Sequence, residues 1–192
     1  ISETERLNKL TQGMLTLNSL DSKGFLTRSN FDINRVIKDT AATFEGTCNA
    51  KDIVLDLTFA ADIQMVYADL GKIQQVLYNL IDNAIKFSRE NSVIYIRENS
   101  VIYIQTSLKY EKVFISVKDT GKGIPDDKKE KVFERFQKLD EFAQGTGLGL
   151  AICQSIVHTF HGSISLESEV GVGSKFTISL PYTPGLELEE RT

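Results

Sequence analysis

Hydrophobic residues recur along the chain at two spacings, one typical of helices and one typical of strands. Near the start, every third or fourth residue is hydrophobic: Leu7, Leu10, Met14 and Leu17. This spacing predicts a helix that packs against another helix. A second helical pattern covers residues 32–50. The turn formers at residues 21–24 separate the two patterns and predict a boundary between an N-terminal helix and a globular domain.

Four further segments alternate hydrophobic with polar residues and therefore predict strands. They span residues 53–59, 113–117, 163–166 and 175–180. More helices are expected to begin near Asp69, near Asp126 and just after Gly145. Strands and helices interleave without the regular spacing of parallel crossover units. The sequence therefore predicts a two-layer α/β sandwich, with a mixed sheet and helices on one face.

One octet is repeated without change, since residues 89–96 and residues 97–104 both read RENSVIYI. The copies offer two identical candidate strands for pairing with residues 113–117. A shift of eight residues keeps the inward and outward alternation of side chains, so the local pattern favours neither copy. Because the second copy leads into a short hairpin, we predict that residues 101–104 pair and that the first copy forms an insertion.

Composition excludes several classes of protein. With a net charge of −4, the chain lacks the basic excess that nucleic-acid binding requires. No apolar run reaches the roughly 18 residues of a membrane span, and no signal-peptide pattern begins at Ile1. We therefore expect a cytoplasmic location. Cys48 and Cys153 are too few and too far apart for a disulfide framework or a zinc site, so we expect reduced packing residues.

The helix expected from Asp69 carries polar residues beside its apolar stripe. The stripe consists of Ile73, Val76, Leu77, Leu80, Ile81, Ala84 and Phe87. At about 100° per residue, Asn79, Asn83 and Lys86 fall within roughly 60° of one another along one edge of that stripe. An amide oxygen suits Mg²⁺ and an ammonium group suits phosphate, although a solvated polar face would show the same pattern.

Two glycine-containing turns add candidate ligand groups. From Asp119 the chain reads DTGKGIP, and a carboxylate, which only accepts hydrogen bonds, can select an exocyclic amine such as that of adenine. The glycines there either admit a flat ligand or simply form a turn. Gly145, Gly147 and Gly149 then precede a helix, where backbone amides form an anion site, unless the turn is only a hinge. The spacing matches neither the G-x-G-x-x-G fingerprint nor a Walker motif.

Taken in order, these stretches resemble the histidine kinase branch of the Bergerat-fold ATPases. The matching motifs are an N box at residues 79–87, a first glycine box at 119–124, an F box at 133–136, a second glycine box at 145–150 and a closing GVGSKF at 171–176. The resemblance covers nearly the whole chain. It implies a Bergerat ATP-binding fold in which Mg²⁺ and ATP lie between the N-box helix and a lid at residues 125–144.

The resemblance also implies a role for each matched residue. Asp119 would hold adenine, Asn83 the magnesium ion, and Lys86 a phosphate. The catalytic residues would be Asn79, Lys86 and Arg135, the last reaching the γ-phosphate when the lid closes. The nucleotide-binding residues would be Asn79, Asn83, Lys86, Asp119, Gly121, Gly123, Ile124, Phe136, Gly145, Thr146, Gly147, Leu148, Gly149 and Leu150. Water-splitting relatives have a glutamate at the position of Asn79. An amide cannot act as that base, so phosphoryl transfer to a protein side chain is favoured over hydrolysis.

In histidine kinases the phosphate acceptor is a histidine on a helical hairpin. This chain has only His158 and His161, both near the end of the helix after the second glycine box. The resemblance therefore implies a catalytic fragment that lacks its acceptor and does not phosphorylate itself. The implied division is a hairpin helix at 1–22, a linker at 23–31, the catalytic domain at 32–184 and an acidic tail at 185–192. The implied partners are the hairpin of a homodimer and the receiver domain of a response regulator, and the full-length parent would be membrane-anchored.

Two alternatives remain at this point. One is a binding-only module that senses nucleotide and docks partners through its first twenty residues. The other is a serine kinase of the same fold, which would need no hairpin histidine. Acid lability of the transferred phosphate distinguishes the serine kinase from the histidine kinase.

Overall fold

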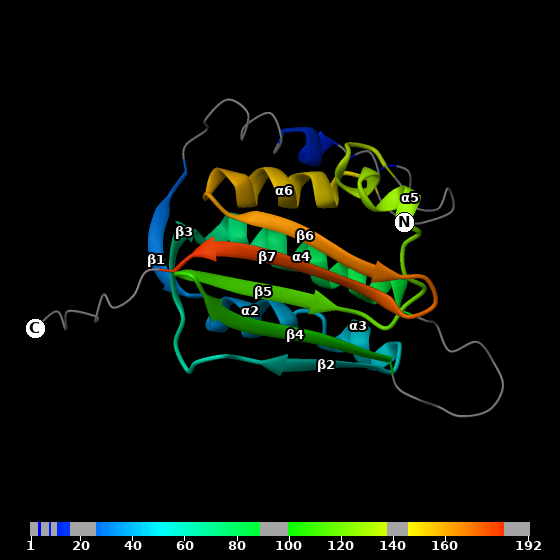
Figure 1. Cartoon of the computed structure of the whole chain (residues 1–192), viewed down its shortest axis with the longest axis horizontal. Helices are drawn as coiled ribbons and strands as arrows, with labels where there is room; N and C mark the ends of the chain where they lie inside the picture. Colours follow the sequence, from blue (N-terminus) through cyan, green and yellow to red (C-terminus); the bar gives the residue numbers. More distant parts are fainter. Residues whose placement is uncertain are drawn as a thin grey trace, which may run out of the picture.

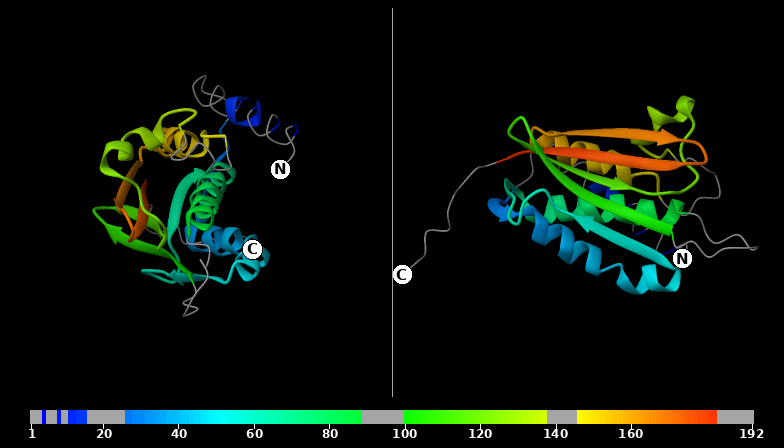
Figure 2. Two further views of the ribbon diagram at one scale, coloured as in Figure 1. Left: turned by 90° about the vertical axis from the view of Figure 1, so that its right-hand side faces the viewer. Right: turned by 60° about the horizontal axis from the view of Figure 1, so that its bottom comes forward.

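The domain consists of one mixed β-sheet with helices packed against one of its faces (Figures 1 and 2). The computed structural model describes residues 4, 8, 11–15, 26–88, 100–137 and 146–182. The sheet contains β2 (Ile53–Thr58), β4 (Ser100–Lys109), β5 (Lys112–Lys118), β7 (Gly173–Pro181) and β6 (Ser163–Glu169), in this spatial order. Strands β2 and β4 are parallel, and the other neighbours are antiparallel. The predicted two-layer α/β sandwich with a mixed sheet is confirmed.

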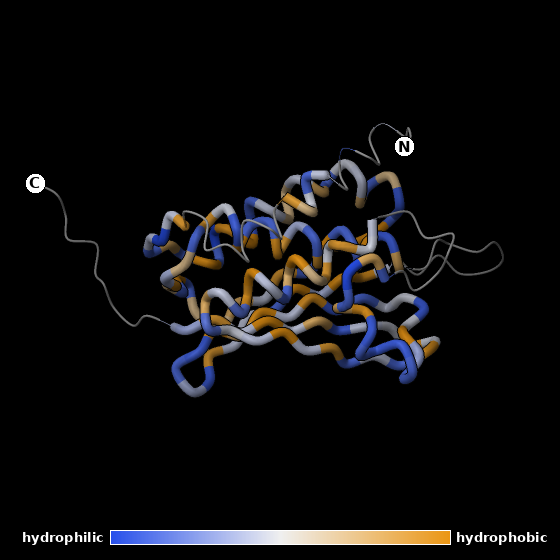
Figure 3. The backbone as a smooth tube through the Cα atoms, turned by 90° about the horizontal axis from the view of Figure 1, so that it is seen from above, coloured by the Kyte–Doolittle hydropathy of each residue, from blue (hydrophilic) through white to orange (hydrophobic). Residues whose placement is uncertain are grey.

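The core lies between the sheet and the helices. Hydrophobic positions alternate with hydrophilic ones along the strands and recur along the helices (Figure 3). Paired residues on the inner face form continuous rows, such as Ile104, Val117, Phe176 and Leu166 across four strands. The first three of these side chains are buried and the fourth is partly buried.

Helix α4 (Leu70–Phe87) packs its predicted stripe against this sheet. Ile73, Val76, Leu77, Leu80 and Ile81 are all fully buried. The Asp69 side chain caps the helix by accepting a hydrogen bond from the Lys72 amide at 3.1 Å. Helix α6 (Gly149–Thr159) packs beside α4, and α5 (Asp126–Lys129) and the short 3-10 helix η1 (Lys131–Phe133) precede it in the chain.

The helical pattern predicted over residues 32–50 is confirmed, and it is divided into two helices. Helix α2 (Ile33–Ala42) ends where the amides of Thr43 and Phe44 donate hydrogen bonds to the carbonyls three residues earlier. Helix α3 (Glu45–Ala50) follows. The Thr43 hydroxyl also donates to the Thr40 carbonyl at 2.7 Å. A threonine hydroxyl offers the backbone a local alternative to helical bonding, which explains the break.

A two-stranded antiparallel sheet was not predicted. It joins β1 (Arg28–Asp32) to β3 (Met65–Asp69), and most of β1 falls in the predicted linker. Strand β1 has little alternation, since Phe31 is its only buried residue. Its pairing partner lies more than thirty residues away in the chain, where local pattern gives no signal.

The second copy of the octet provides the paired strand, as predicted. Residues 101–104 belong to β4, which pairs with β2 on one side and with β5 on the other. The first copy, residues 89–96, lies outside the described residues, as do Leu7, Leu10 and Leu17 of the predicted N-terminal seam. Residues 11–15 are helical, and Met14 is about half exposed. Among the described helices, none is both long and apolar enough to cross a membrane.

Candidate nucleotide site

Helix α4 brings the two glycine boxes together. Gly121 lies against its C-terminal end, where an added Cβ would be only 2.0 Å from the Phe87 carbonyl oxygen. Gly149 lies against its middle, where the Asn79 amide donates to the Gly149 carbonyl at 3.3 Å. The predicted adenine and phosphate segments therefore both border the helix that carries Asn79 and Asn83.

Asp119 is a buried carboxylate at the end of β5, with only 4% of its surface exposed. Its Oδ1 accepts hydrogen bonds from the Gly121 amide at 2.8 Å and the Ser174 amide at 3.3 Å. Burial raises the pKa of this carboxyl group, and hydrogen bonds from the Gly121 and Ser174 amides partly counteract the rise. The side chain is thus held in a fixed orientation before any ligand binds.

The hairpin of β6 and β7 holds Asp119 in place, and our sequence reasoning assigned this hairpin no role in the site. An added Cβ at Gly173 would lie 2.1 Å from the Asp119 carbonyl oxygen, and the Asp119 amide donates to the Ser174 carbonyl at 2.9 Å. The Ser168 hydroxyl accepts from the Ile124 amide at 2.8 Å. The glycine and serine of the closing motif were the signal that could have indicated this contact.

The first glycine box is shaped by contacts within the protein itself. Gly123 has a φ of +70°, and its missing Cβ accommodates the Glu169 carbonyl oxygen, which would otherwise lie 2.0 Å away. Ile124, the next residue, is 4% exposed. These glycines are therefore required for a tight turn and close backbone packing, whether or not a ligand approaches them.

The second glycine box forms an uncapped start to α6. Gly147 has a φ of +71°, its carbonyl accepts from the Phe136 amide at 2.9 Å, and Gly145 lies outside the described residues. Leu148 occupies the N-cap position without a side-chain cap, and its amide approaches the Thr146 hydroxyl at 3.4 Å. The first amides of a helix have no partner within it, so this turn can bind a phosphate. Leu150 lies in the first turn.

Asn83 and Lys86 follow Asn79 along α4. Asn83 is half-buried one turn further on, and the exposed Lys86 ammonium forms an ion pair with Asp82. The described residues contain no group of three or more His, Cys, Asp or Glu side chains that could hold a metal ion. A single neutral amide oxygen suits Mg²⁺, which retains waters and shares phosphate oxygens, so Asn83 fits a magnesium ion that arrives with a nucleotide.

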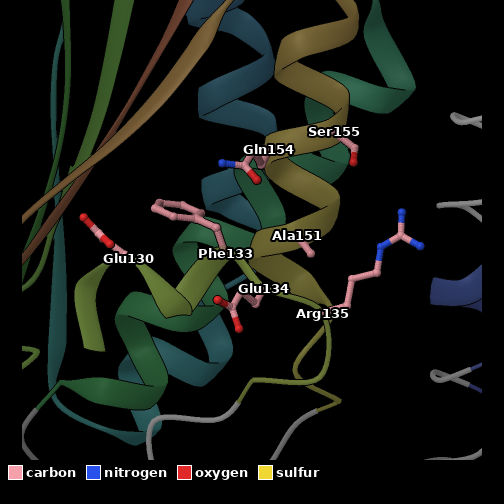
Figure 4. Close-up of a pocket in the computed structure, with 7 residues that line it drawn as sticks. All are labelled: Glu130, Phe133, Glu134, Arg135, Ala151, Gln154 and Ser155. Atoms are coloured by element: carbon pink, nitrogen blue, oxygen red, sulfur yellow. The ribbon is translucent and has the colours of Figure 1, made fainter. Parts of the chain in front are cut away.

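Arg135 and Phe136 follow η1 in the chain. Arg135 lines a pocket of about 420 Å³ between η1 and α6, and its guanidinium points away from the other labelled side chains (Figure 4). Gln154 of α6 lines this pocket. Cys153 lies on a different side of α6, where its thiol contacts the Val76 carbonyl of α4. Phe136 is 54% exposed with a φ of +65°. The predicted roles of both residues stay predictions.

The histidines lie at the C-terminal end of α6, and both cysteines are buried. His158 is exposed in the last turn of α6, and His161, with a φ of +58°, forms part of the turn that ends the helix. Cys48 and Cys153 are buried free thiols, as predicted. Burial raises the pKa of the Cys153 thiol to about 12.

Comparison with known proteins identifies the class. Residues 68–184 match the family "Histidine kinase-, DNA gyrase B-, and HSP90-like ATPase". Sensor protein SrrB of Staphylococcus aureus is 33% identical over 191 residues, which cover 94% of this chain and 30% of SrrB. The chain belongs to this ATPase family, in its histidine kinase branch, and spans less than a third of the length of that relative.

Two solved structures share the fold. Full-length ShkA in complex with AMPPNP superposes with a TM-score of 0.78 and 26% identity, covering 92% of this chain and 36% of ShkA. Histidine kinase ThkA in complex with response regulator protein TrrA superposes with a TM-score of 0.70 and 29% identity, covering 93% of this chain and 49% of the other. These relatives do not favour the two alternatives, the binding-only module and the serine kinase.

Proposed function

We propose that this domain binds Mg²⁺–ATP and transfers its γ-phosphoryl group to a histidine on a dimerisation hairpin. The observation that carries the proposal is Asp119, a buried carboxylate that the Gly121 and Ser174 amides fix beside the end of α4. A buried carboxylate that only accepts hydrogen bonds selects a donor such as the adenine amino group. ShkA, a relative of the same fold, was solved with AMPPNP.

Each remaining part of the site would act by binding and orientation. The Asn83 amide oxygen would bind the magnesium ion, and the amides at the start of α6 would hold the phosphate chain. Lys86 would exchange Asp82 for a phosphate oxygen, and Arg135 would reach the γ-phosphate when the lid closes. Magnesium supplies charge neutralisation of the phosphates in such sites.

Asn79 supports transfer rather than hydrolysis. Its amide cannot remove a proton from water, and it already donates to the Gly149 carbonyl. The acceptor would be a hairpin histidine, since His158 and His161 lie at the far end of α6 from the phosphate turn. We further propose that residues 1–22 belong to that hairpin, that the parent protein is a membrane-anchored homodimer with this domain in the cytoplasm, and that a response regulator receives the phosphate.

Calorimetric titration with ATP tests the binding step. The wild-type chain should bind ATP with magnesium support, and Asp119→Asn and Asn83→Ala should each weaken binding at least roughly tenfold. Loss of a hydrogen bond to a charged group, worth about 1.5–3 kcal/mol, sets this scale. Unchanged affinity in Asp119→Asn would refute the adenine assignment.

A labelling experiment with γ-labelled ATP tests the transfer step. The chain alone should remain unlabelled and should label a separately supplied hairpin that contains the acceptor. Phosphohistidine on the chain alone that disappears in His158→Ala would contradict the assignment. Fast phosphate release that is lost in Asn79→Ala would favour a hydrolase instead.

A further inference from the structure

Two residues of the N-terminal segment contact α6, one at each end of α6. Figures 1 and 2 show the helix of residues 11–15 beside α6. Strand β1 lies near the C-terminal end of α6. The first contact is made by Gly13 and the second by Arg28. Helix α6 begins at the candidate phosphate turn, so the Gly13 contact lies at that turn and the Arg28 contact lies at the far end of the helix.

Gly13 packs directly on the second glycine box. It is buried, whereas its neighbours Gln12 and Met14 are exposed. An added Cβ at Gly13 would lie 2.8 Å from Leu148 Cδ1 and 3.7 Å from Ile152 Cδ1. The glycine therefore allows the N-terminal helix to approach α6 closely, and the side chain that it covers belongs to the residue between Gly147 and Gly149.

Arg28 contacts the C-terminal end of α6. Its guanidinium carbon lies 5.5 Å from the ring centroid of Phe160, the C-cap residue of the helix. Strand β1 fixes the position of Arg28, because β1 pairs with β3 and the neighbouring Thr27 amide donates to Asp69 Oδ2 at 2.9 Å. The second contact therefore belongs to the domain, and Gly13 provides the contact between the N-terminal helix and α6.

We propose that docking of the N-terminal helix through Gly13 orders the phosphate turn and thereby raises the affinity for nucleotide. This inference rests on the proposed ATP-binding function. The turn contains Gly147 and Gly149, whose freedom in the unbound state must be lost when a phosphate binds. Packing Leu148 under the docked helix removes part of that freedom in advance. By linkage, bound nucleotide must strengthen docking by the same factor.

Substitution of Gly13 tests the effect on affinity. Gly13→Leu should push the helix off Leu148 and weaken ATP binding about fivefold or more, the lower end of typical coupling between two sites. Leu15→Gln is the matched control, since Leu15 is 57% exposed on the opposite side of the same helical turn and should leave affinity unchanged. Unchanged or tighter binding in Gly13→Leu would overturn the inference, whereas absent binding in the wild type would refute the proposed function itself.

A cross-link tests the geometry and the linkage. The added Cβ at Gly13 would lie 3.6 Å from Leu148 Cβ, within the range of a disulfide, so Gly13→Cys with Leu148→Cys should form an intramolecular cross-link on oxidation. Cys48 and Cys153 are buried and should not compete. With ATP binding to the variant verified by calorimetry, saturating ATP should speed the cross-linking. Failure to cross-link would overturn the docking, and a rate that ATP does not change would overturn the coupling.

Discussion

At the scale of single residues, Asp119 shows a conflict between ligand binding and stability. The carboxylate is buried among backbone groups, and burial raises its pKa above the ordinary value of 3.8. The folded protein therefore holds this proton more tightly than the unfolded chain does. As the pH rises from about 3.8 through the raised pKa, this group lowers the free energy of unfolding, and the loss persists at neutral pH.

We predict that Asp119→Asn raises the melting temperature of the nucleotide-free protein at pH 7. An asparagine oxygen can still accept from the Gly121 and Ser174 amides, and it needs no buried charge. The advantage over the wild type should shrink as the pH falls below the raised pKa, where the aspartate becomes neutral. Melting curves from pH 3 to 8 check this, with the exposed Asp127→Asn as control. A lower melting temperature at pH 7 would show that the charge stabilises the fold.

At the scale of elements, two glycines at opposite ends of α4 (Leu70–Phe87) have different roles. Gly71 lies in the first turn, where an added Cβ would meet only Asp69 Oδ1, at 3.5 Å. Gly121 lies at the other end of the helix, where the added Cβ would collide with the Phe87 carbonyl. The first position therefore tolerates a side chain and the second does not.

We predict that Gly71→Ala stabilises the protein by about 0.5–1 kcal/mol, the usual difference between these residues within a helix. Gly121→Ala should strongly destabilise the fold, because backbone atoms would have to move. Urea denaturation of both variants measures the changes. A destabilised Gly71→Ala would mean that the N-terminus of α4 needs the freedom of glycine.

At the scale of the whole molecule, tertiary contacts choose between the two octets. The Thr106 hydroxyl, which follows the second copy, accepts from the Ala60 amide at 3.0 Å, and Thr106 is 7% exposed. Pairing the first copy in the same register would bring Glu98 to that position and bury an unpaired charge. The hairpin from β4 to β5 also closes through Tyr110 and Glu111, both with positive φ. If the first copy were paired instead, this connection would be eight residues longer.

We predict that the two copies differ sharply in their tolerance of the same substitution. Ile102→Asp places a charge at a fully buried position of β4 and should destabilise the protein by more than about 3 kcal/mol. Ile94→Asp, the equivalent change in the first copy, should have little effect on the free energy of unfolding. Deleting either octet produces the same sequence, which should keep its ATP affinity and its melting temperature. Equal effects of the two substitutions would show that both copies serve the structure.

The sequence by itself determined the candidate site residues and the positions of most helices and strands. The apolar stripe of α4, the alternation in the strands of the main sheet and the ordered motifs were each visible within a short window, because side-chain periodicity reflects local backbone geometry. The same windows identified Asn83, Asp119 and the glycine turns as candidates. These motifs also indicated the family to which the chain belongs.

The tertiary structure alone decided which distant segments meet. Two examples are the pairing of β1 with β3 and the contacts of Gly173 and Ser174 with Asp119, which join residues far apart in the chain. Such contacts depend on packing across the fold, and no local pattern encodes them. The burial that raises the pKa of Asp119 belongs to the same group, because a side chain loses its water only when other elements cover it.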